Sequence, residues 1–431
     1  MLMDFIFEHG GHIAIFLLFL LMFLSVPVFV SMGISAFVAS LLLEDPFQTF
    51  KSFINIGWQG ASIFELVALP LFIFTGTIMQ RTDAGRDLFD VTKVWAGAIP
   101  NSLGVATILA CGVFAAISGS SVATAATVGL VAIPLLLDEG YGESRAGGFV
   151  AGGGTLGIII PPSIPLILYG VITETSIGQL FIGGVIPGII MMGFFTIYVL
   201  LSRPRITVEH HYTLNQRLST TWHSFGVVLL PAVIIAAIYT GIFTPTEVGA
   251  LSVIYVVVLG FAQKRLNLEK IKTAAVSATA TTTMLFMLIV FGQYFAHFLT
   301  FEQVPQSIAS AIIENASGVW AVTLMILAYI VLGMFLESAA MLLISIPIFF
   351  PVAEQLGINP IVFGIFAAIS MEIAQISPPI GVNLFTINGI SRIGLWKIAR
   401  GAFPFLLIQI GMLYLIYFVP EVVLWLPNSM K

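Results

Sequence analysis

The stretch GGGTLGIIIPPSIP, residues 152–165, interrupts an apolar run that continues from Ala146 to Ile172. Glycine leaves the backbone free to depart from a helix, and proline withholds the N–H that the next helical turn needs. A run this long and apolar is otherwise what a membrane-spanning helix requires. The stretch therefore predicts a helix that breaks inside a membrane, where irregular backbone survives only if it is buried in protein or lines a wet cavity.

The composition places most of the chain in lipid. Of its 431 residues, 58% are hydrophobic and 9% are charged, whereas an ordinary soluble domain has about 25% charged residues. Apolar stretches near or above spanning length recur from Gly11 to Leu426, which predicts an all-α polytopic membrane protein. The first, from about residue 12 to 43, is too long for a signal peptide, and we interpret it as one retained helix.

Basic residues predict the orientation, because Lys and Arg accumulate in cytoplasmic loops. Placing every basic cluster inside leaves only Lys51 and Lys431 outside and puts the N-terminus in the cytoplasm. The residues then inside are Arg81, Arg86, Lys93, Arg145, Arg203, Arg205, Arg217, Lys264, Arg265, Lys270, Lys272, Arg392, Lys397 and Arg400.

This threading requires two segments, 95–137 and 319–353, to enter and leave the membrane on the same side. Both are therefore expected to be re-entrant hairpins, with tips at ISGSSVATAA (117–126) and FLESAAM (335–341). Four tightly turned spanning helices are the alternative.

A shift of 217 residues brings the two halves of the sequence into register. The matches are Pro134 with Pro351, Gly140 with Gly357, Gly147 with Gly364, Pro161-Pro162 with Pro378-Pro379, and Ser121 with Ser338. Combined with the charge threading, the halves have opposite orientations. Inverted repeats whose broken helices meet near the membrane midplane are typical of secondary transporters, although glycines also serve for helix packing.

Three stretches, residues 117–129, 152–170 and 241–250, resemble the large membrane subunit of tripartite ATP-independent periplasmic (TRAP) transporters, and the resemblance covers essentially the whole chain. It implies an inverted-repeat, elevator-type transporter of the bacterial inner membrane, with two re-entrant hairpins and two broken helices. It also implies sodium-coupled import of an organic anion that a periplasmic binding protein delivers. A small four-helix membrane subunit is expected as a separate polypeptide, because the chain begins directly with the large subunit.

Five segments are expected on this basis. Scaffold helices of the first repeat occupy 1–94, and the first transport module, hairpin plus broken helix, occupies 95–172. Scaffold helices and a cytoplasmic surface helix follow in 173–317. The second transport module occupies 318–390, and a C-terminal helix occupies 391–431.

Two sodium sites are expected, each between a hairpin tip and the broken helix of the same module. Uncharged hydroxyl and carbonyl oxygens suit a sodium ion that must be released again, and sodium is the only metal expected. The expected sodium-binding residues are Ser118, Ser120, Ser121, Gly153, Gly154, Thr155, Ser338, Ala339, Met371, Glu372 and Gln375. The alternative for the hydroxyl residues is hydrogen bonding to nearby carbonyls or capping of the half-helices.

The repeat is asymmetric at two acidic positions, because Glu337 and Glu372 stand where the first module has Ser120 and Thr155. Carboxylates inside a membrane are costly and suggest function. They could bind sodium, carry a proton or accept backbone N–H groups at a half-helix start. The last role is preferred for Glu337, whereas the role of Glu372 stays open. For Glu65 we expect a structural hydrogen bond to the scaffold.

The substrate carboxylate is expected to meet N–H groups and hydroxyls, because no Lys or Arg lies within an apolar core segment. The expected substrate-binding residues are Ser121, Thr124, Pro161, Ser163, Ser338, Ser377, Pro378 and Asn383. A dianion would gain more from a paired arginine, so a monoanionic acid sugar such as N-acetylneuraminate (sialic acid) is favoured over succinate or malate. Arg145 could reach a substrate that faces the cytoplasm, although its position in a cytoplasmic loop explains it equally well.

Other function classes lack their motifs. The sequence has no Gly-Lys dipeptide, which excludes a P-loop, and it has neither an HExxH motif nor a Gly-Asp pair. An enzyme is therefore not expected. The alternative function is a passive organic-anion channel, which can also contain re-entrant hairpins.

Overall fold

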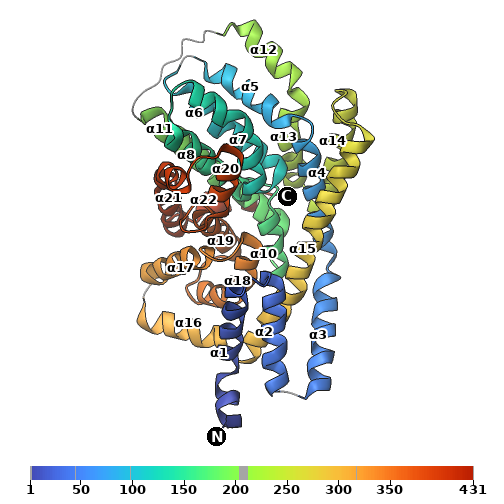
Figure 1. Cartoon of the computed structure of the whole chain (residues 1–431), viewed down its shortest axis with the longest axis vertical. Coiled ribbons are helices and arrows are strands. Elements are labelled where there is room, and N and C mark those ends of the chain that lie inside the picture. The colour runs from blue at the N-terminus through green and yellow to red at the C-terminus, as the bar shows by residue number, and fades with distance from the viewer. Residues whose placement is uncertain (1, 44, 98, 203–211, 317, 431) are drawn as a thin grey trace.

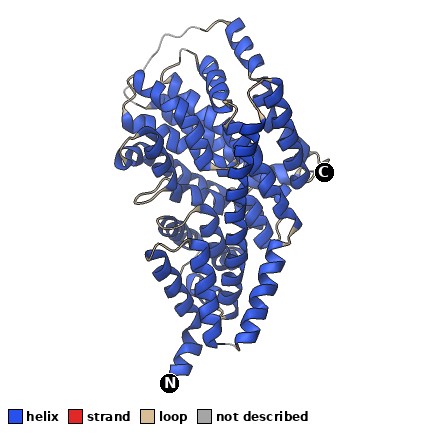
Figure 2. Cartoon of the chain, turned by 45° about the vertical axis from the view of Figure 1, so that its right-hand side comes forward, coloured by secondary structure: helices blue, strands red, loops and turns tan. Residues whose placement is uncertain are grey.

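The computed structural model describes residues 2–43, 45–97, 99–202, 212–316 and 318–430, and within these ranges it contains helices and no strand (Figures 1 and 2). The helices are α1 (Leu2–Phe23), α2 (Val28–Leu43), α3 (Pro46–Ala61), the 3-10 helix η1 (Phe64–Val67), α4 (Ala68–Gln80), α5 (Ala84–Ala96), α6 (Ser102–Ser118), α7 (Ser121–Asp138), α8 (Glu143–Gly154), α9 (Leu156–Ile159), α10 (Ile164–Thr173), α11 (Ile177–Leu201), α12 (Leu214–His223), α13 (Phe225–Tyr239), α14 (Pro245–Ala262), α15 (Leu268–Phe301), α16 (Val304–Asn315), α17 (Gly318–Gly333), α18 (Ser338–Gln355), α19 (Pro360–Gln375), α20 (Val382–Ser391), α21 (Leu395–Phe418) and α22 (Glu421–Asn428).

Seven of the described helices are long and apolar enough to cross a membrane, or up to nine if each of two bent pairs counts as one span. The bent pairs are α3 with η1–α4, at 58°, and α12 with α13, at 67°. The expectation of an all-α polytopic membrane protein is confirmed.

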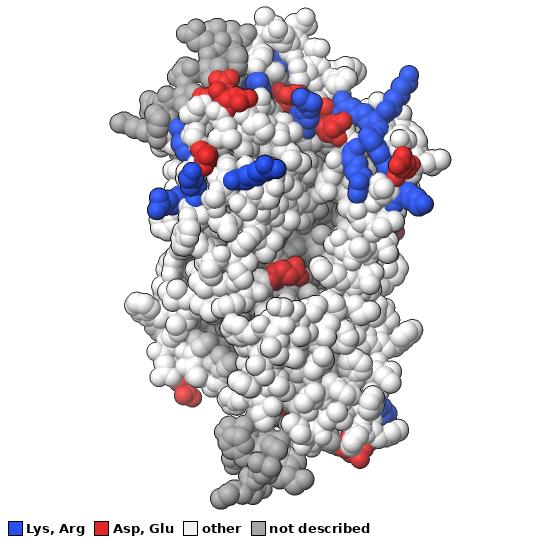
Figure 3. Space-filling view, in the orientation of Figure 1, with Lys and Arg blue, Asp and Glu red and all other residues white. Residues whose placement is uncertain are grey.

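The first apolar stretch is not the single helix that the sequence suggested. It forms two packed antiparallel helices, α1 and α2, because the chain reverses between Leu24 and Pro27, where Ser25 takes a left-handed conformation with φ of 63°. The N-terminal end of α1 therefore lies at the same end of the molecule as the start of α3 (Figure 1). On the face shown, Lys and Arg gather at the opposite end, around α5 and α12 (Figure 3). This arrangement does not support a cytoplasmic N-terminus together with an outside position for Lys51.

Both expected hairpins are present. Hairpin 1 consists of α6 and α7, joined by Gly119 and Ser120, and hairpin 2 consists of α17 and α18, joined by residues 334–337. We call residues 118–121 tip 1 and residues 334–338 tip 2. The hairpins lie in opposite halves of the molecule along its long axis (Figure 1). Ser121 and Ser338, which the repeat aligns, are the first residues of α7 and α18.

Both expected helix breaks are also present. The helical run α8–α9 ends before residues 160–163 (break 1), after which α10 begins, and α19 ends before residues 376–381 (break 2), after which α20 begins. The Pro161-Pro162 and Pro378-Pro379 bonds are both cis. Break 1 thus falls inside the quoted stretch, where the glycine and proline pattern predicts it.

The two modules exchange elements. The half-helix α10 packs against α18 of hairpin 2, and α20 packs against α7 of hairpin 1. The Tyr169 hydroxyl of α10 donates a 2.6 Å hydrogen bond to the carbonyl oxygen of Pro360, the first residue of α19. Moreover, α11 packs on α19 and α21 packs on α8. The expected boundaries at residues 172 and 390 left α11 and α21 outside the two transport modules. Their contacts with α19 and α8 place both helices in the same bundle as the modules.

Two helices at the basic end lie against each other. The Trp95 ring N–H of α5 donates a 2.9 Å hydrogen bond to the Thr221 hydroxyl of α12. The Arg265 guanidinium, in the link before α15, forms an ion pair with Asp87 of α5. These contacts agree with the expected surface helix in 173–317; Arg203 and Arg205 lie outside the described residues.

Candidate functional site

Tip 1 docks onto break 1 mainly through backbone. The Ile164 N–H, at the start of α10, donates a 3.4 Å hydrogen bond to the Gly119 carbonyl oxygen. Gly119 has a φ of +62°, and a Cβ there would lie 2.7 Å from the carbonyl oxygen of Pro162. A side chain at Gly157 would likewise collide with the backbone of tip 1. The close approach therefore depends on glycine at both positions.

The hydroxyl groups of tip 1 bond within the tip. The Ser118 and Thr124 hydroxyls lie 3.0 Å apart, and the Thr124 hydroxyl donates a 2.8 Å bond to the Ser120 carbonyl oxygen. The Ser120 hydroxyl caps α7 by accepting the Ala123 N–H at 3.3 Å. These bonds hold the tip in one shape and leave oxygen lone pairs available to a cation.

At the end of α8, ahead of break 1, the expected site residues face different neighbours. Gly154 lies against Ser121 and Ala125, whereas Gly153 lies against Cys111 of α6, so Gly153 serves close helix packing. Thr155 is fully buried and its hydroxyl donates a 2.6 Å bond to the Gly152 carbonyl oxygen.

The half-helix α10 is capped at break 1. The Ser163 hydroxyl accepts the Leu166 N–H at 3.3 Å, while Pro161 is buried before it. Ser163 thus has the capping role that the sequence analysis gave as the alternative for the hydroxyl residues.

Tip 2 is held to break 2 by a side-chain bond. The Gln375 amide, at the end of α19, donates to the Ser338 hydroxyl. Gly333 packs directly on Ala374, and the Ser377 hydroxyl donates a 2.6 Å bond to the Ile373 carbonyl oxygen. Hairpin 2 is therefore fixed by side chains where hairpin 1 is fixed by backbone.

Two carboxylates belong to the second module. Glu337 occupies the N-cap position of α18, with the Ala340 amide beside its carboxylate but without capping geometry. Glu372 has no exposed surface, and the Ser121 hydroxyl of tip 1 lies next to it. Among the described residues Glu372 has no ion pair, and neither of its oxygens has a hydrogen bond of normal geometry.

Buried polar atoms without partners concentrate in the second module. Seven of the twelve such atoms among the described residues lie there: both oxygens of Glu372, one oxygen of Glu337, the Gln375 amide oxygen, the Ser370 hydroxyl and both amide atoms of Asn383. A native interior satisfies nearly all its buried polar groups, so such a cluster indicates a place that a ligand completes. The remaining expected residues, Ala339, Met371 and Pro378, lie beside this cluster in sequence.

Arg145 is occupied elsewhere. Its guanidinium donates 3.0 Å bonds to the Asn101 side-chain oxygen and to the Ser202 hydroxyl, and it lies over the rings of Tyr141 and Phe149. These contacts join the start of α8 to the end of α11. They favour the structural explanation of this arginine over contact with substrate.

Three cavities lie away from the expected residues. One of about 560 Å³ is lined by η1, the α10–α11 link and the start of α14. Another, of about 670 Å³, lies between α3 and α15 on one side and α10 and α18 on the other, and a third, of about 590 Å³, lies between α4–α5 and α7. None of their lining residues is an expected sodium or substrate residue, because those residues are packed inside the chain.

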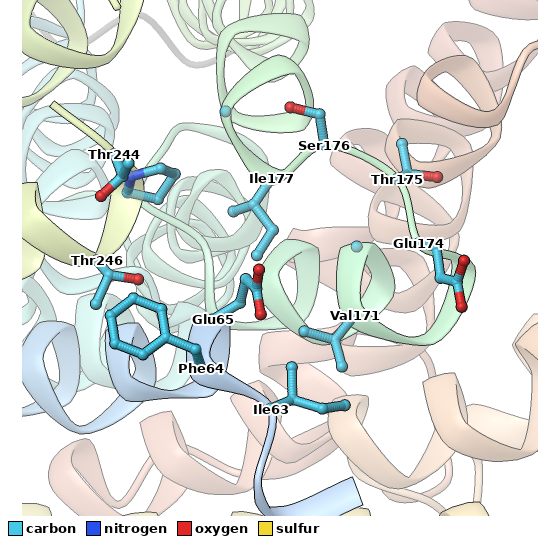
Figure 4. Close-up of a pocket in the computed structure, with 13 residues that line it drawn as sticks. Ile63, Phe64, Glu65, Val171, Glu174, Thr175, Ser176, Ile177, Thr244 and Thr246 are labelled. Atoms are coloured by element: carbon cyan, nitrogen blue, oxygen red, sulfur yellow. The ribbon is translucent and has the colours of Figure 1, made fainter. Parts of the chain in front are cut away.

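Glu65 corrects an expectation. Instead of bonding to the scaffold, it is exposed and lines the first of these cavities, and its carboxylate has no hydrogen bond among the described residues. Its carboxylate points toward Ile177 and Val171, with Thr246 on one side and Glu174 on the other (Figure 4).

Two polar residues near the breaks were not expected. Gln409 of α21 donates a 2.6 Å hydrogen bond to the Thr155 hydroxyl, and Ser370 of α19 is buried without a partner. Gln409 carries a signal in the sequence, because it is an isolated amide in an apolar helix. The contact between α21 and α8 itself could not be read from one sequence.

Comparison with known proteins agrees with this architecture. Residues 15–422 match the family model of the DctM component of tripartite ATP-independent periplasmic transporters. The C4-dicarboxylate TRAP transporter large permease protein DctM of Pseudomonas aeruginosa is 37% identical over 402 residues, which cover 92% of this chain and 94% of that protein. The sialic acid TRAP transporter permease protein SiaT of Haemophilus influenzae is 30% identical, over 97% of this chain and 68% of that protein.

A solved structure shares the fold at low sequence identity. The YdaH transporter of Alcanivorax borkumensis matches with a TM-score of 0.64 and 15% identity, over 97% of this chain and 99% of that chain. Together with the paired hairpins and broken helices, these matches identify the chain as a multi-pass transporter subunit and not an enzyme. It belongs to the DctM family, the large permease subunits of TRAP transporters.

Proposed function

We propose that this chain is the transport subunit of a sodium-coupled symporter that imports an organic acid anion. The observation that carries the proposal is the position of Ser121 beside Glu372, which joins tip 1 to the second broken helix in the buried interior. The neutral Ser121 hydroxyl there adjoins a carboxylate that, within the part of the chain that the structure describes, forms no ion pair. Such surroundings favour a small monovalent cation as co-substrate. A passive anion channel, the alternative, has no need of this arrangement.

The substrate carboxylate binds in this proposal at the starts of α10 and α20. The first N–H groups of a helix lack intrahelical partners and favour negative charge. Ser163 lies at the first of these starts, and Asn383, buried with an unpaired amide, lies at the second. These neutral donors suit a substrate that has one carboxylate plus hydroxyl or amide groups.

The preferred substrate is therefore a monoanionic acid sugar such as N-acetylneuraminate. The Pseudomonas relative is named for C4-dicarboxylates and the Haemophilus relative for sialic acid, so the relatives' names do not choose between the two classes. Calorimetry on the cognate binding protein with N-acetylneuraminate, succinate and malate tests the choice. Selectivity for succinate would contradict the acid sugar and leave the transporter assignment intact.

Transport is proposed to follow an elevator mechanism, in which α6–α11 and α17–α21 move against α2–α4 and α13–α15. One of the cavities lies at the seam between these groups, with α3 and α15 on one side and α10 and α18 on the other. Space at such a seam is what a sliding unit requires. We place the basic end in the cytoplasm, which puts the N-terminal end of α1 outside.

The partners are proposed to be a separate small four-helix membrane subunit and a periplasmic binding protein, in the bacterial inner membrane. Uptake by proteoliposomes tests this assignment. The chain alone is expected to transport nothing. Chain, small subunit and substrate-loaded binding protein are expected to transport only with an inward sodium gradient. Full-rate uptake by the isolated chain would contradict the tripartite arrangement, and uptake without sodium would contradict the coupling.

A further inference from the structure

The helix α21 runs alongside α8 from the basic end of the molecule to Thr155, the joint between α8 and α9. At the basic end, the Lys397 ammonium pairs with Glu143 at 2.6 Å, and the Ser144 hydroxyl donates a 2.8 Å bond to the Lys397 carbonyl oxygen. One helical turn further, Gly148 and Gly401 are in backbone contact, so that a Cβ on either would collide with the other helix. Small residues allow this close approach of two membrane helices.

The contact ends at a single polar pair. After Phe405, whose ring packs on Gly152, the next residue on this face of α21 is Gln409. Its amide donates a 2.6 Å bond to the Thr155 hydroxyl, which in turn donates to the Gly152 carbonyl oxygen at 2.6 Å. Gln409 and Thr155 have no exposed surface, and Thr155 is the residue at which α8 ends.

The second amide atom of Gln409 is buried without a partner. Turning the amide over would exchange its two atoms and still leave one of them unpaired. A buried unpaired amide is costly, and leucine would fill the same place without that cost. The structure therefore retains a polar group here at a cost in stability, which indicates a role at the joint between α8 and α9.

The internal repeat does not place an amide at the position that corresponds to Gln409. At the shift of 217 residues, Gln409 of α21 corresponds to Met192 of α11, and Thr155 corresponds to Glu372. Met192 directs its sulfur toward Gly112 of α6. The second module thus has a carboxylate and a methionine where the first has a hydroxyl and an amide, so the Gln409–Thr155 pair belongs to the first site alone.

We propose that Gln409 is a positioning residue for the first sodium site. By holding the Thr155 hydroxyl, it fixes the joint between α8 and α9 and thereby the backbone that this joint presents to tip 1, where Gly154 lies against Ser121 and Gly157 lies against Ser120. The inference rests on the proposed sodium site at tip 1. It also makes α21 a part of the moving unit, because the helix is tied to α8 at both ends of their contact.

The test uses the complete transporter and the variants Gln409→Leu and Thr155→Val, which keep side-chain volume. Met412→Leu, a buried change on α21, is the matched control. Loss of one buried hydrogen bond predicts that Gln409→Leu raises the half-saturating sodium concentration roughly threefold to tenfold, with the substrate KM at saturating sodium unchanged. Because both residues act through one bond, the double variant is expected to match either single variant. Sodium-dependent thermal stabilisation of the purified complex is expected to show the same shift without transport.

An unchanged sodium dependence in Gln409→Leu, while Thr155→Val shifts it, would overturn the role of Gln409. Shifts that multiply in the double variant would overturn action through Thr155. If Ser121→Ala, Thr155→Val and Gln409→Leu all leave the sodium dependence unchanged, the proposed first sodium site fails, which is a separate result.

Discussion

Ser121, the first residue of α7, lies beside the Glu372 carboxylate of α19, so residues from the two halves of the repeat meet in the buried interior. The contact arises because each broken helix reaches the hairpin of the other half, as α20 does with α7. A cation at this place would contact both modules, so that both must be in position before it is bound.

Replacing Glu372 by Gln removes the charge and keeps the shape. If Glu372 is a sodium ligand, the half-saturating sodium concentration is expected to rise roughly ten- to hundredfold, because hydrogen bonds and contacts of a buried charge are stronger than neutral ones. Sodium titration of uptake measures this change. Unaltered sodium dependence combined with a lost pH dependence would instead identify Glu372 as a proton carrier.

The Gln375–Ser338 bond is the side-chain hydrogen bond that joins tip 2 to the end of α19, beside the packing of Gly333 on Ala374. Gln375→Leu is therefore expected to expose the tip. A Leu336→Cys variant reports this by maleimide labelling, since the native Cys111 is buried. Labelling is expected to increase several-fold in the Gln375→Leu background. An Ala125→Cys variant in hairpin 1 is the control and is expected to stay protected; equal increases at both positions would indicate general unfolding instead of tip opening.

The docking of tip 1 predicts a large difference between two glycines. Gly119 and Gly140 both have positive φ, but a Cβ at Gly119 meets the Pro162 carbonyl oxygen, whereas a Cβ at Gly140 meets nothing within 4 Å. Gly140→Ala is expected to cost about 1–2 kcal/mol, the price of the left-handed conformation alone. Gly119→Ala adds the displacement of tip 1 and is expected to lower both thermal stability and sodium affinity. Equal effects of the two changes would contradict the close docking.

Much of this arrangement could be predicted from residue chemistry. Glycine and proline predicted break 1 and break 2. The distribution of Lys and Arg between the two sides of the membrane predicted both hairpins. The turn between α1 and α2 was missed because Ser25 and Pro27 are weak signals within an apolar run. The meeting of Ser121 with Glu372 could not be predicted, because it depends on how the two halves exchange helices.

The Gln409–Thr155 pair could not be predicted from the sequence either, because it too depends on how helices distant in the sequence pack together. The sequence shows that Gln409 is polar within an apolar helix, but only the packing of α21 on α8 identifies its partner. Glu65 illustrates the opposite error. Its carboxylate was expected to form a hydrogen bond to the scaffold, whereas the bend between α3 and η1 exposes it in a cavity.

Concentrative uptake tests the central claim most directly. Proteoliposomes containing the chain and its small subunit, with loaded binding protein outside, would start with equal substrate on both sides and an inward sodium gradient. Sodium coupling predicts that internal substrate rises above the external concentration, and that Glu372→Gln slows this rise at the same sodium gradient. Substrate that stays equal on both sides in the wild-type transporter, while exchanging freely, would contradict coupling and identify a passive channel.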